Sequence, residues 1–187
     1  MMEELARNLD RFAKDGVREK VMAGSEKITA STSKDKIAKW LKGAMDRLDS
    51  LVDEKTRNQV MENCGYSCAD HNKKLIGRMT AKRKKFKSVD EFLEAEQRKP
   101  MRGTKLIREG DVLYYFYTPS TFSKSLRCYC GLLRGLPASE KVSSTYCHCS
   151  KGFVEKFWEG VLGRPVNVEL VQSAVSGSQE CKFAIRL

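Results

Sequence analysis

Three close pairs of cysteines carry the clearest chemistry in this sequence of 187 residues. Two pairs that folding brings together can supply four thiolates to one Zn²⁺ ion, and cysteine thiolates are also the usual ligands of iron–sulfur clusters. We therefore predict a cysteine-rich metal site that holds zinc, with an iron–sulfur cluster as the alternative. His148, between Cys147 and Cys149, and His71, three residues after Cys68, can each add a nitrogen ligand. The candidate cysteine ligands are Cys64, Cys68, Cys128, Cys130, Cys147 and Cys149.

Two other interpretations of these cysteines stay open. A reduced cysteine behaves as a small apolar residue, so the pairs can be buried thiols without a ligand. Alternatively, the cysteines carry redox or nucleophilic chemistry. In the nucleophilic case, Cys147 or Cys149 is the nucleophile of a hydrolase, and His148 or Glu169 is its base. The weakness of this alternative is that neighbouring residues often point apart, and no acid that would orient the base is identifiable. Cys181 alternates with apolar residues and is assigned to the core.

A helix and two strands must position the last cysteine pair. Gly163 and Pro165 end the predicted helix, because glycine accepts a left-handed conformation and proline blocks continuation. Residues 166–170 and 181–187 then alternate apolar and polar side chains, which predicts an antiparallel hairpin covered by the helix. The apolar face of the helix recurs at the helical period and consists of Phe153, Val154, Phe157, Trp158, Val161 and Leu162.

Further strands are predicted upstream of this unit. Residues 105–108 and 112–117 are strand formers on either side of a hairpin-like turn at 109–111. A cluster of tyrosines in the second strand is explained equally well by an aromatic pocket and by sheet packing; it consists of Tyr114, Tyr115 and Tyr117. Residues 125–133 are expected to add a strand, because Leu126, Cys128, Cys130 and Leu132 share one face at a period of two.

The first half of the chain is predicted to be helical. Capping-box patterns mark helix starts at Thr32, with Asp35, and at Ser88, with Glu91. A flexible connection is expected from residue 24 to residue 33. The expected helices cover residues 1–22, about four turns after Thr32, residues 55–63, residues 66–85, and a short stretch from Ser88 to just before Pro100.

These elements predict an α+β fold. A helical N-terminal region, residues 1–103, is followed by a mostly antiparallel sheet of four or five strands with helices packed on one side, residues 104–187. A chain of 187 residues is long enough for a real core. We expect both regions to form one compact domain.

Composition indicates a globular protein of the cytoplasm. Hydrophobic residues make up 41% of the chain and charged residues 32%, and no run approaches the roughly 18 apolar residues of a membrane span. The charged N-terminus lacks a signal-peptide pattern. Seven cysteines without an export signal favour reduced thiols or bound metal over disulfides. We expect no membrane partner.

The net charge of +11 is concentrated in Lys73-Lys74 and in the segment from Lys82 to Lys87. Such a segment can contact nucleic acid or another polyanion. No recognition helix or groove-reading motif lies beside it, so the preferred interpretation is the solvated end of a basic helix. We predict no specific nucleic-acid partner. A small-molecule ligand and a homodimer are both compatible with the sequence.

Two motifs near the C-terminus resemble the 4-vinyl-reductase domain superfamily over roughly residues 104–187. A glycine at position 152 or 160 leads into the first motif, and both motifs contain the residues typical of the family. They read Gly163-Arg164-Pro165-Val166-Asn167-Val168-Glu169 and Gly177-Ser178-Gln179-Glu180-Cys181-Lys182-Phe183. The Cys-x-Cys pairs are closest to a cysteine-rich prokaryotic branch of the superfamily.

The resemblance implies a noncatalytic, sensory role, in which the helix-covered sheet holds a small hydrophobic or metal-containing ligand near the cysteine pairs. The superfamily also includes subunits of a vesicle-trafficking complex, regulators with attached DNA-binding domains, and a more distant set of aminothiazoline-carboxylate hydrolases. Typical members carry a cysteine where this chain has Ser173, whereas Cys181 matches. The alternatives are a cysteine-dependent hydrolase of a small substrate and a structural or nucleic-acid adaptor that uses the basic helix.

Overall fold

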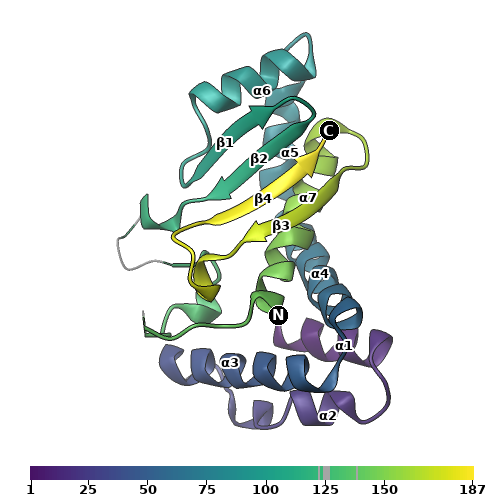
Figure 1. Cartoon of the computed structure of the whole chain (residues 1–187), viewed down its shortest axis with the longest axis vertical. Helices are drawn as coiled ribbons and strands as arrows, with labels where there is room; N and C mark the ends of the chain where they lie inside the picture. Colours follow the sequence, from purple (N-terminus) through teal and green to yellow (C-terminus); the bar gives the residue numbers. More distant parts are fainter. Residues whose placement is uncertain (122, 124–126, 138) are drawn as a thin grey trace.

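A four-stranded antiparallel sheet has helices on one face and a group of helices beyond one end (Figure 1). The computed structural model describes residues 1–121, 123, 127–137 and 139–187. The fold is α+β, with most helices before the sheet in the chain, which confirms the predicted class.

The helices are α1 (Met2–Phe12), α2 (Val17–Val21), α3 (Lys34–Leu51), α4 (Glu54–His71), α5 (Lys73–Arg83), α6 (Val89–Arg98) and α7 (His148–Leu162). The strands are β1 (Thr104–Glu109), β2 (Val112–Tyr117), β3 (Asn167–Gln172) and β4 (Cys181–Arg186). Short 3₁₀ helices cover Ser25–Lys27, Pro119–Thr121, Gly131–Leu133, Ser144–Cys147 and Ala174–Ser176.

The strand order in the sheet is β1-β2-β4-β3, and every neighbouring pair is antiparallel. Alternation along β4 buries Phe183 and Ile185 on the face covered by α7, as the sequence predicts. The other face is open in Figure 1. On that face the ammonium group of Lys182 lies 3.9 Å from the ring centre of Tyr114, and that of Lys105 lies 4.0 Å from the ring centre of Phe116.

The strand predicted at residues 125–133 is wrong for the part of it that the structure describes. Cys128 and Cys130 lie in a loop, Leu132 lies in the 3₁₀ helix Gly131–Leu133, and Leu126 is outside the described residues. The physical reason is a competing contact. A Cβ atom on Gly135 would lie 2.3 Å from the backbone nitrogen of Asp35, so this segment packs closely on the start of α3 instead of on a strand.

Three helix boundaries also differ from the prediction. The stretch 1–22 is broken between α1 and α2 by Gly16, whose φ of 77° is left-handed. The N-cap of α3 is Ser33 rather than Thr32, because the hydroxyl of Thr32 accepts a hydrogen bond from the N–H of Thr29. The third difference concerns the helices predicted at 55–63 and 66–85. Helix α4 continues through Gly65 and ends before Asn72, whose side chain donates to the carbonyl of Cys68 at 2.8 Å.

The other boundary signals are confirmed. The hydroxyl of Ser88 accepts a hydrogen bond from the N–H of Glu91 at the start of α6. At the end of α7, Gly163 has a φ of 71°. Residues 104–117 form the predicted hairpin, with Gly110 at a positive φ in its turn. The expected flexible connection contains the short helix Ser25–Lys27.

Two clusters of buried apolar residues form the core. The helical cluster joins α1, α3, α4 and the start of α7, and includes Leu5, Leu9, Leu41, Met45, Leu48, Met61, Cys64 and Tyr146. The sheet cluster joins the sheet to α6 and the rest of α7, and includes Phe92, Leu93, Leu113, Tyr115, Phe157, Trp158, Phe183 and Ile185. Leu170 packs against both clusters.

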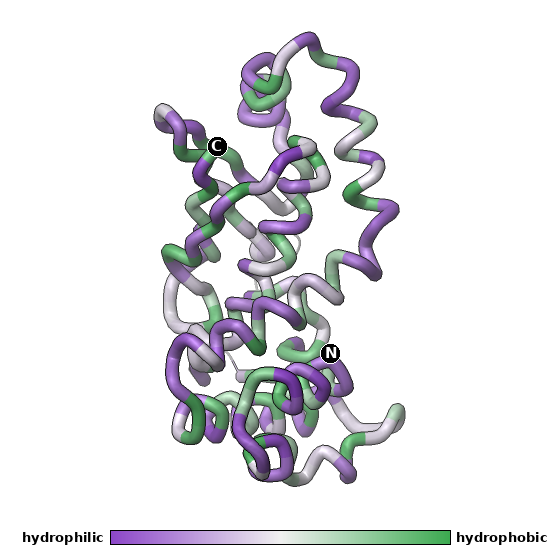
Figure 2. The backbone as a smooth tube through the Cα atoms, turned by 90° about the vertical axis from the view of Figure 1, so that its right-hand side faces the viewer, coloured by the Kyte–Doolittle hydropathy of each residue, from purple (hydrophilic) through white to green (hydrophobic). Residues whose placement is uncertain are grey.

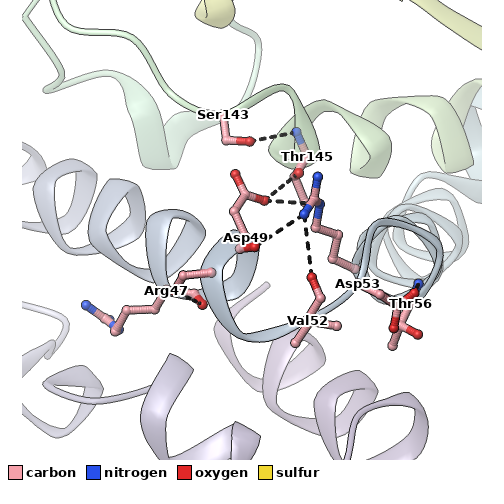
Figure 3. Close-up of polar contacts among 9 residues, drawn as sticks. Arg47, Asp49, Val52, Asp53, Thr56, Ser143 and Thr145 are labelled. Carbon is pink, nitrogen blue, oxygen red and sulfur yellow. Dashed lines mark hydrogen bonds and ion pairs between the residues drawn. The ribbon is translucent and has the colours of Figure 1, made fainter.

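A polar network fastens the helical group to the segment before α7 (Figure 3). The hydroxyl of Thr145 donates to Asp49 at 2.7 Å, and the guanidinium of Arg57 lies 3.4 Å from the same carboxylate oxygen. Asp53 caps α4 by accepting a hydrogen bond from the N–H of Thr56. The end of α3, the start of α4 and the 3₁₀ helix Ser144–Cys147 are thereby held at one point.

Hydrophilic and hydrophobic residues are interspersed along the backbone (Figure 2). Within the described part of the chain, no helix has the length and apolar character needed to cross a membrane.

Candidate ligand-binding site

The site begins with a close crossing of α4 and α7. A Cβ atom on Gly65 would lie 2.1 Å from the carbonyl oxygen of Cys149, and one on Gly152 would lie 2.2 Å from the carbonyl oxygen of Glu62. Real Cβ atoms do not approach other atoms so closely, so the two backbones are in direct contact and only glycine fits either position. This contact fixes the first turns of α7 against the middle of α4.

A cavity of about 390 Å³ lies beside the crossing. Its walls come from the ends of α4 and α7 that flank the crossing, from β1 and β2, and from the loop around Cys130. Five aromatic residues line it: Tyr115, Tyr117, Tyr129, Tyr146 and Phe153. The volume is in the range of small-molecule sites, and the lining has the aromatic character typical of them.

One member of each cysteine pair lines this cavity: Cys68, Cys130 and Cys149. The other members point elsewhere. Cys64 is buried and its sulfur accepts a hydrogen bond from the amide of Asn8, with a nitrogen–sulfur distance of 3.4 Å. The sulfur of Cys147 lies 2.9 Å from the hydroxyl oxygen of Ser173. Two of the pairs are therefore divided between the cavity wall and the packed interior.

Cys128, the pair member next to Cys130, lies at a second cavity of about 290 Å³. The loop residues around this cavity include Arg127 and Arg134. Its sulfur accepts a hydrogen bond from the N–H of Cys130, at 3.4 Å. Among the residues that the structure describes, no group of three or more His, Cys, Asp or Glu side chains is arranged to hold a metal ion. The zinc or iron–sulfur site therefore stays a prediction.

Burial favours the neutral form of two thiols that line the cavity. It raises the pKa of Cys68 and raises that of Cys149 well above its usual value. Behind the wall, burial raises the pKa of Cys64 to about 11 and that of Cys128 to about 12. A thiol needs a lowered pKa to act as a nucleophile near neutral pH, so these groups behave as apolar wall atoms.

Phenol groups supply part of the polar lining of the cavity, beside Asn72, Arg102, Thr104 and Ser150. The hydroxyl of Tyr146 donates to the sulfur of Cys130 at 2.8 Å, and the hydroxyl of Tyr129 donates to the carbonyl of Gly103. Tyr117 makes ring contacts with Tyr129 at 5.3 Å between centroids, yet its hydroxyl has no hydrogen-bond partner among the described residues. Burial raises its pKa well above 10, so this hydroxyl keeps its proton and can donate it to a ligand.

The predicted tyrosine cluster is divided by the pleat of β2. Tyr115 and Tyr117 line the cavity, whereas Tyr114 lies on the open face of the sheet beneath Lys182. Tyr129 and Tyr146 also line the cavity, although the sequence does not predict it. Each is adjacent to a candidate cysteine, but no local pattern indicates that the two phenols face the same cavity.

The residues of the alternative hydrolase do not meet. His148 lies with its Nδ1 atom 3.1 Å from Glu62, and Lys151 donates to the same oxygen at 2.6 Å. Burial alone would raise the pKa of Glu62, but the hydrogen bonds from these two residues lower it. Glu169 is exposed on β3, and Cys147 faces Ser173. Neither His148 nor Glu169 is therefore placed to act as a base for either thiol.

Cys181 is buried, as predicted, and belongs to a cluster that the sequence did not suggest. A hydrogen bond with Cys181 and burial together raise the pKa of Cys147. Ser173 is also buried, and its hydroxyl lies 3.1 Å from that of Ser176. This cluster joins the start of α7 to the β3–β4 connection. The other sequence candidate, His71, is exposed, with its Nδ1 atom 2.7 Å from the carbonyl oxygen of Ser67.

The chain belongs to a family of unknown function, DUF6144. The family model matches residues 2–187. None of the curated proteins matches the sequence. Among solved structures, it is similar to the phenol-responsive sensory domain of the transcription activator PoxR, crystallised with phenol. The identity is 12%, the TM-score is 0.43, and the match covers 100% of this chain and 90% of that one. A likeness this distant assigns no function.

Proposed function

We propose that this protein is a noncatalytic, sensory domain that binds a small, mainly apolar molecule in the cavity beside the α4–α7 crossing. The observation that carries the proposal is the cavity itself: about 390 Å³, walled by aromatic rings and by thiols from all three cysteine pairs. A largely apolar cavity with a few convergent polar groups is the usual form of a ligand site.

The polar groups define how the ligand is held. The hydroxyl of Tyr117 has no partner among the described residues, and it faces a space lined by rings. A ligand with one hydrogen-bond acceptor and an otherwise apolar surface satisfies this hydroxyl. Leaving the hydroxyl unpaired in a ligand-filled cavity would cost about 1–3 kcal/mol, so the acceptor contributes to selectivity.

Electrostatics supports binding over catalysis. Burial raises the pKa of two of the thiols that line the cavity, Cys68 and Cys149. The two imidazoles near these cysteines in sequence are directed elsewhere, His148 to Glu62 and His71 to the carbonyl of Ser67. A cysteine nucleophile needs an adjacent base or a lowered pKa. The described residues of the wall supply neither.

We also propose that residues 104–187 are related to 4-vinyl-reductase domains. Two glycines of the C-terminal motifs support this relationship: Gly163 and Gly177 have φ angles of 71° and 125°. Residues other than glycine rarely adopt these positive φ angles, so the backbone conformation at both positions requires glycine.

A neutral fluorescent probe, N-phenyl-1-naphthylamine, tests the binding proposal. We expect saturable enhancement of its fluorescence by the protein. Replacing Cys68→Phe fills the cavity from α4 and should weaken probe binding at least roughly tenfold, whereas Gln59→Phe, at an exposed position of the same helix, should not. Equal binding by both variants, or no binding by the parent protein, contradicts the proposal.

The metal prediction is tested separately. The prediction comes from the pairing of cysteines in the sequence. Three thiols from distant parts of the chain line one cavity, but the described side chains are not arranged to hold an ion. We expect about one equivalent of zinc in freshly purified protein, or an iron–sulfur absorption spectrum in protein prepared without air. Elemental analysis that finds neither, together with freely titratable thiols, contradicts the metal prediction and leaves the apolar-ligand proposal intact.

A further inference from the structure

One face of α5 is packed against α7 and the opposite face is exposed. A Cβ atom on Gly160 would lie 2.5 Å from a methyl carbon of Ile76, and the hydroxyl of Thr80 donates to the carbonyl of Gly160 at 2.9 Å. The exposed side carries a row of basic residues that continues past the end of the helix. We call it the basic row; it consists of Lys74, Arg78, Lys84 and Lys85.

The charges of the basic row are not neutralised by the protein. Nearby lysines are paired: Lys73 lies 3.3 Å from Asp70, and Lys82 forms an ion pair with the buried Glu96. The four side chains of the row make no ion pair or hydrogen bond with the described part of the chain. The helix itself, Lys73–Arg83, contains no acidic residue. An anionic partner would relieve the mutual repulsion of these cations.

The dimensions of the row fit an extended polyanion better than a single small anion. Lys74 and Arg78 are one turn apart, and the distance along the axis from Lys74 to Lys85 is roughly 16 Å at 1.5 Å per residue. A DNA duplex presents one phosphate per 1.7 Å of its axis, or roughly ten phosphates over that length. Gly77 and Ala81 lie between the cations on the same side, and no bulky side chain there keeps a backbone away.

The chemistry of the outer face favours nucleic acid over a membrane surface. A helix that binds a membrane needs large apolar residues on the face that enters the interface. The large apolar residues of α5 are partly buried, and Ile76 contacts α7. The outer face therefore has charge without an apolar anchor.

We propose that the basic row binds the phosphate backbone of nucleic acid without reading its sequence. Lysine and arginine on an exposed helix face contact phosphates, which position a protein but carry no sequence information. Each neutralised phosphate releases condensed counterions, so the affinity falls steeply with salt. This surface lies on α5 and just past its end, and none of its four residues lines the cavity of the proposed ligand.

Fluorescence anisotropy with a labelled DNA duplex of about 30 base pairs tests the proposal in roughly 50 mM salt and in a salt series. We compare two double charge reversals of the row, Lys74→Glu with Arg78→Glu and Lys84→Glu with Lys85→Glu. The matched control is Lys36→Glu with Lys39→Glu, which makes the same change in net charge at exposed positions of α3. Melting temperatures verify that all three variants fold.

We expect each reversal in the row to weaken binding at least roughly tenfold, and to reduce the slope of log affinity against log salt by about 2, one unit per lost phosphate contact. The control should change affinity less than about threefold. Two duplexes of unrelated sequence should bind equally. Three results overturn the proposal: no binding by the parent protein at low salt, an equal loss in the control, or preferential binding to vesicles that contain phosphatidylserine.

Discussion

The α4–α7 crossing and the cavity beside it are built from the same two helices, yet they are packed in opposite ways. At the crossing, two glycines bring the backbones into contact. Three residues beyond Gly65 along α4, Cys68 borders about 390 Å³ of space that Cys149 and Phe153 of α7 also line.

This difference shows how a small domain keeps a pocket between its elements. Side chains that face a cavity lose packing contacts, so the surrounding elements must be held by contacts elsewhere. Here the crossing and the sheet cluster hold them. The cavity wall should therefore tolerate substitution, whereas the crossing and the sheet should not.

The largest effect should come from breaking the crossing. Gly152→Ala places a methyl group 2.2 Å from the carbonyl oxygen of Glu62, and the two helices must separate. We expect a loss of at least about 3 kcal/mol in the free energy of unfolding, or failure to fold, because a well-packed contact is overfilled against rigid backbone. Chemical denaturation measures the change.

Gly77→Ala is the matched control for this prediction. Nothing lies within 4 Å of a Cβ atom at that position of α5. Alanine should stabilise the helix by about 0.5–1 kcal/mol. If Gly152→Ala, like Gly77→Ala, left the free energy of unfolding unchanged or raised it, α4 and α7 would not be in close contact.

The sheet cluster gives the next largest effect. Phe183 is fully buried in the centre of β4, and its ring lies 5.2 Å from that of Tyr117. Phe183→Ala should cost about 3–5 kcal/mol of unfolding free energy, because the cavity it leaves cannot collapse fully. An unchanged melting temperature would mean that β4 is assigned wrongly.

High pH should act on the cavity wall through its phenols. Burial raises the pKa of Tyr117 and of Tyr115 above the usual 10 in the folded protein. The neutral forms are then favoured in the folded state, so this stability is complete below about pH 10 and is lost as the pH rises further. The expected loss is about 1.4 kcal/mol per pH unit for each group.

Denaturation at about pH 9 and pH 11 checks this decline, with Tyr117→Phe as the comparison. The variant keeps the ring contacts and lacks the ionisable hydroxyl, so its stability should fall less over the same interval. If the two proteins lose stability in parallel, the hydroxyl of Tyr117 is exposed to water and is not part of an enclosed wall.

The smallest effect should be at the cavity wall itself. Cys68→Phe extends into open space and should change the free energy of unfolding by less than about 1 kcal/mol, whereas Cys64→Phe, one turn earlier and fully packed, should cost about 1–3 kcal/mol or more. Thermal melting compares the two. A larger loss at Cys68 would reverse the proposed contrast between wall and interior.

The elements of this fold that rest on local chemistry could be predicted from the sequence. Ser88 caps α6, Gly163 ends α7, and the two hairpins form where alternating strands flank turn residues. These signals are short-range, since each depends on residues within a few positions of one another.

The sequence-based predictions are wrong where a contact between distant parts of the chain overrides the local pattern. A period of two from Leu126 to Leu132 indicates a strand, but the close approach of Gly135 to Asp35 fastens that loop to α3. The sequence pattern predicts a helix break around Gly65, whereas in the structure this glycine is the contact point for α7 and lies inside a continuous helix. A glycine has the same local signature in both roles.

In the candidate site, too, local sequence features can be predicted whereas contacts between distant parts of the chain cannot. Cysteine pairing is visible in the chain, and the three paired segments meet around one cavity. Which member of each pair faces the cavity depends on the orientation of each helix and loop after packing, and so does the convergence of Tyr117, Tyr129 and Tyr146. Composition and periodicity specify the elements, whereas the backbone contact of α4 with α7 decides where the space between them lies.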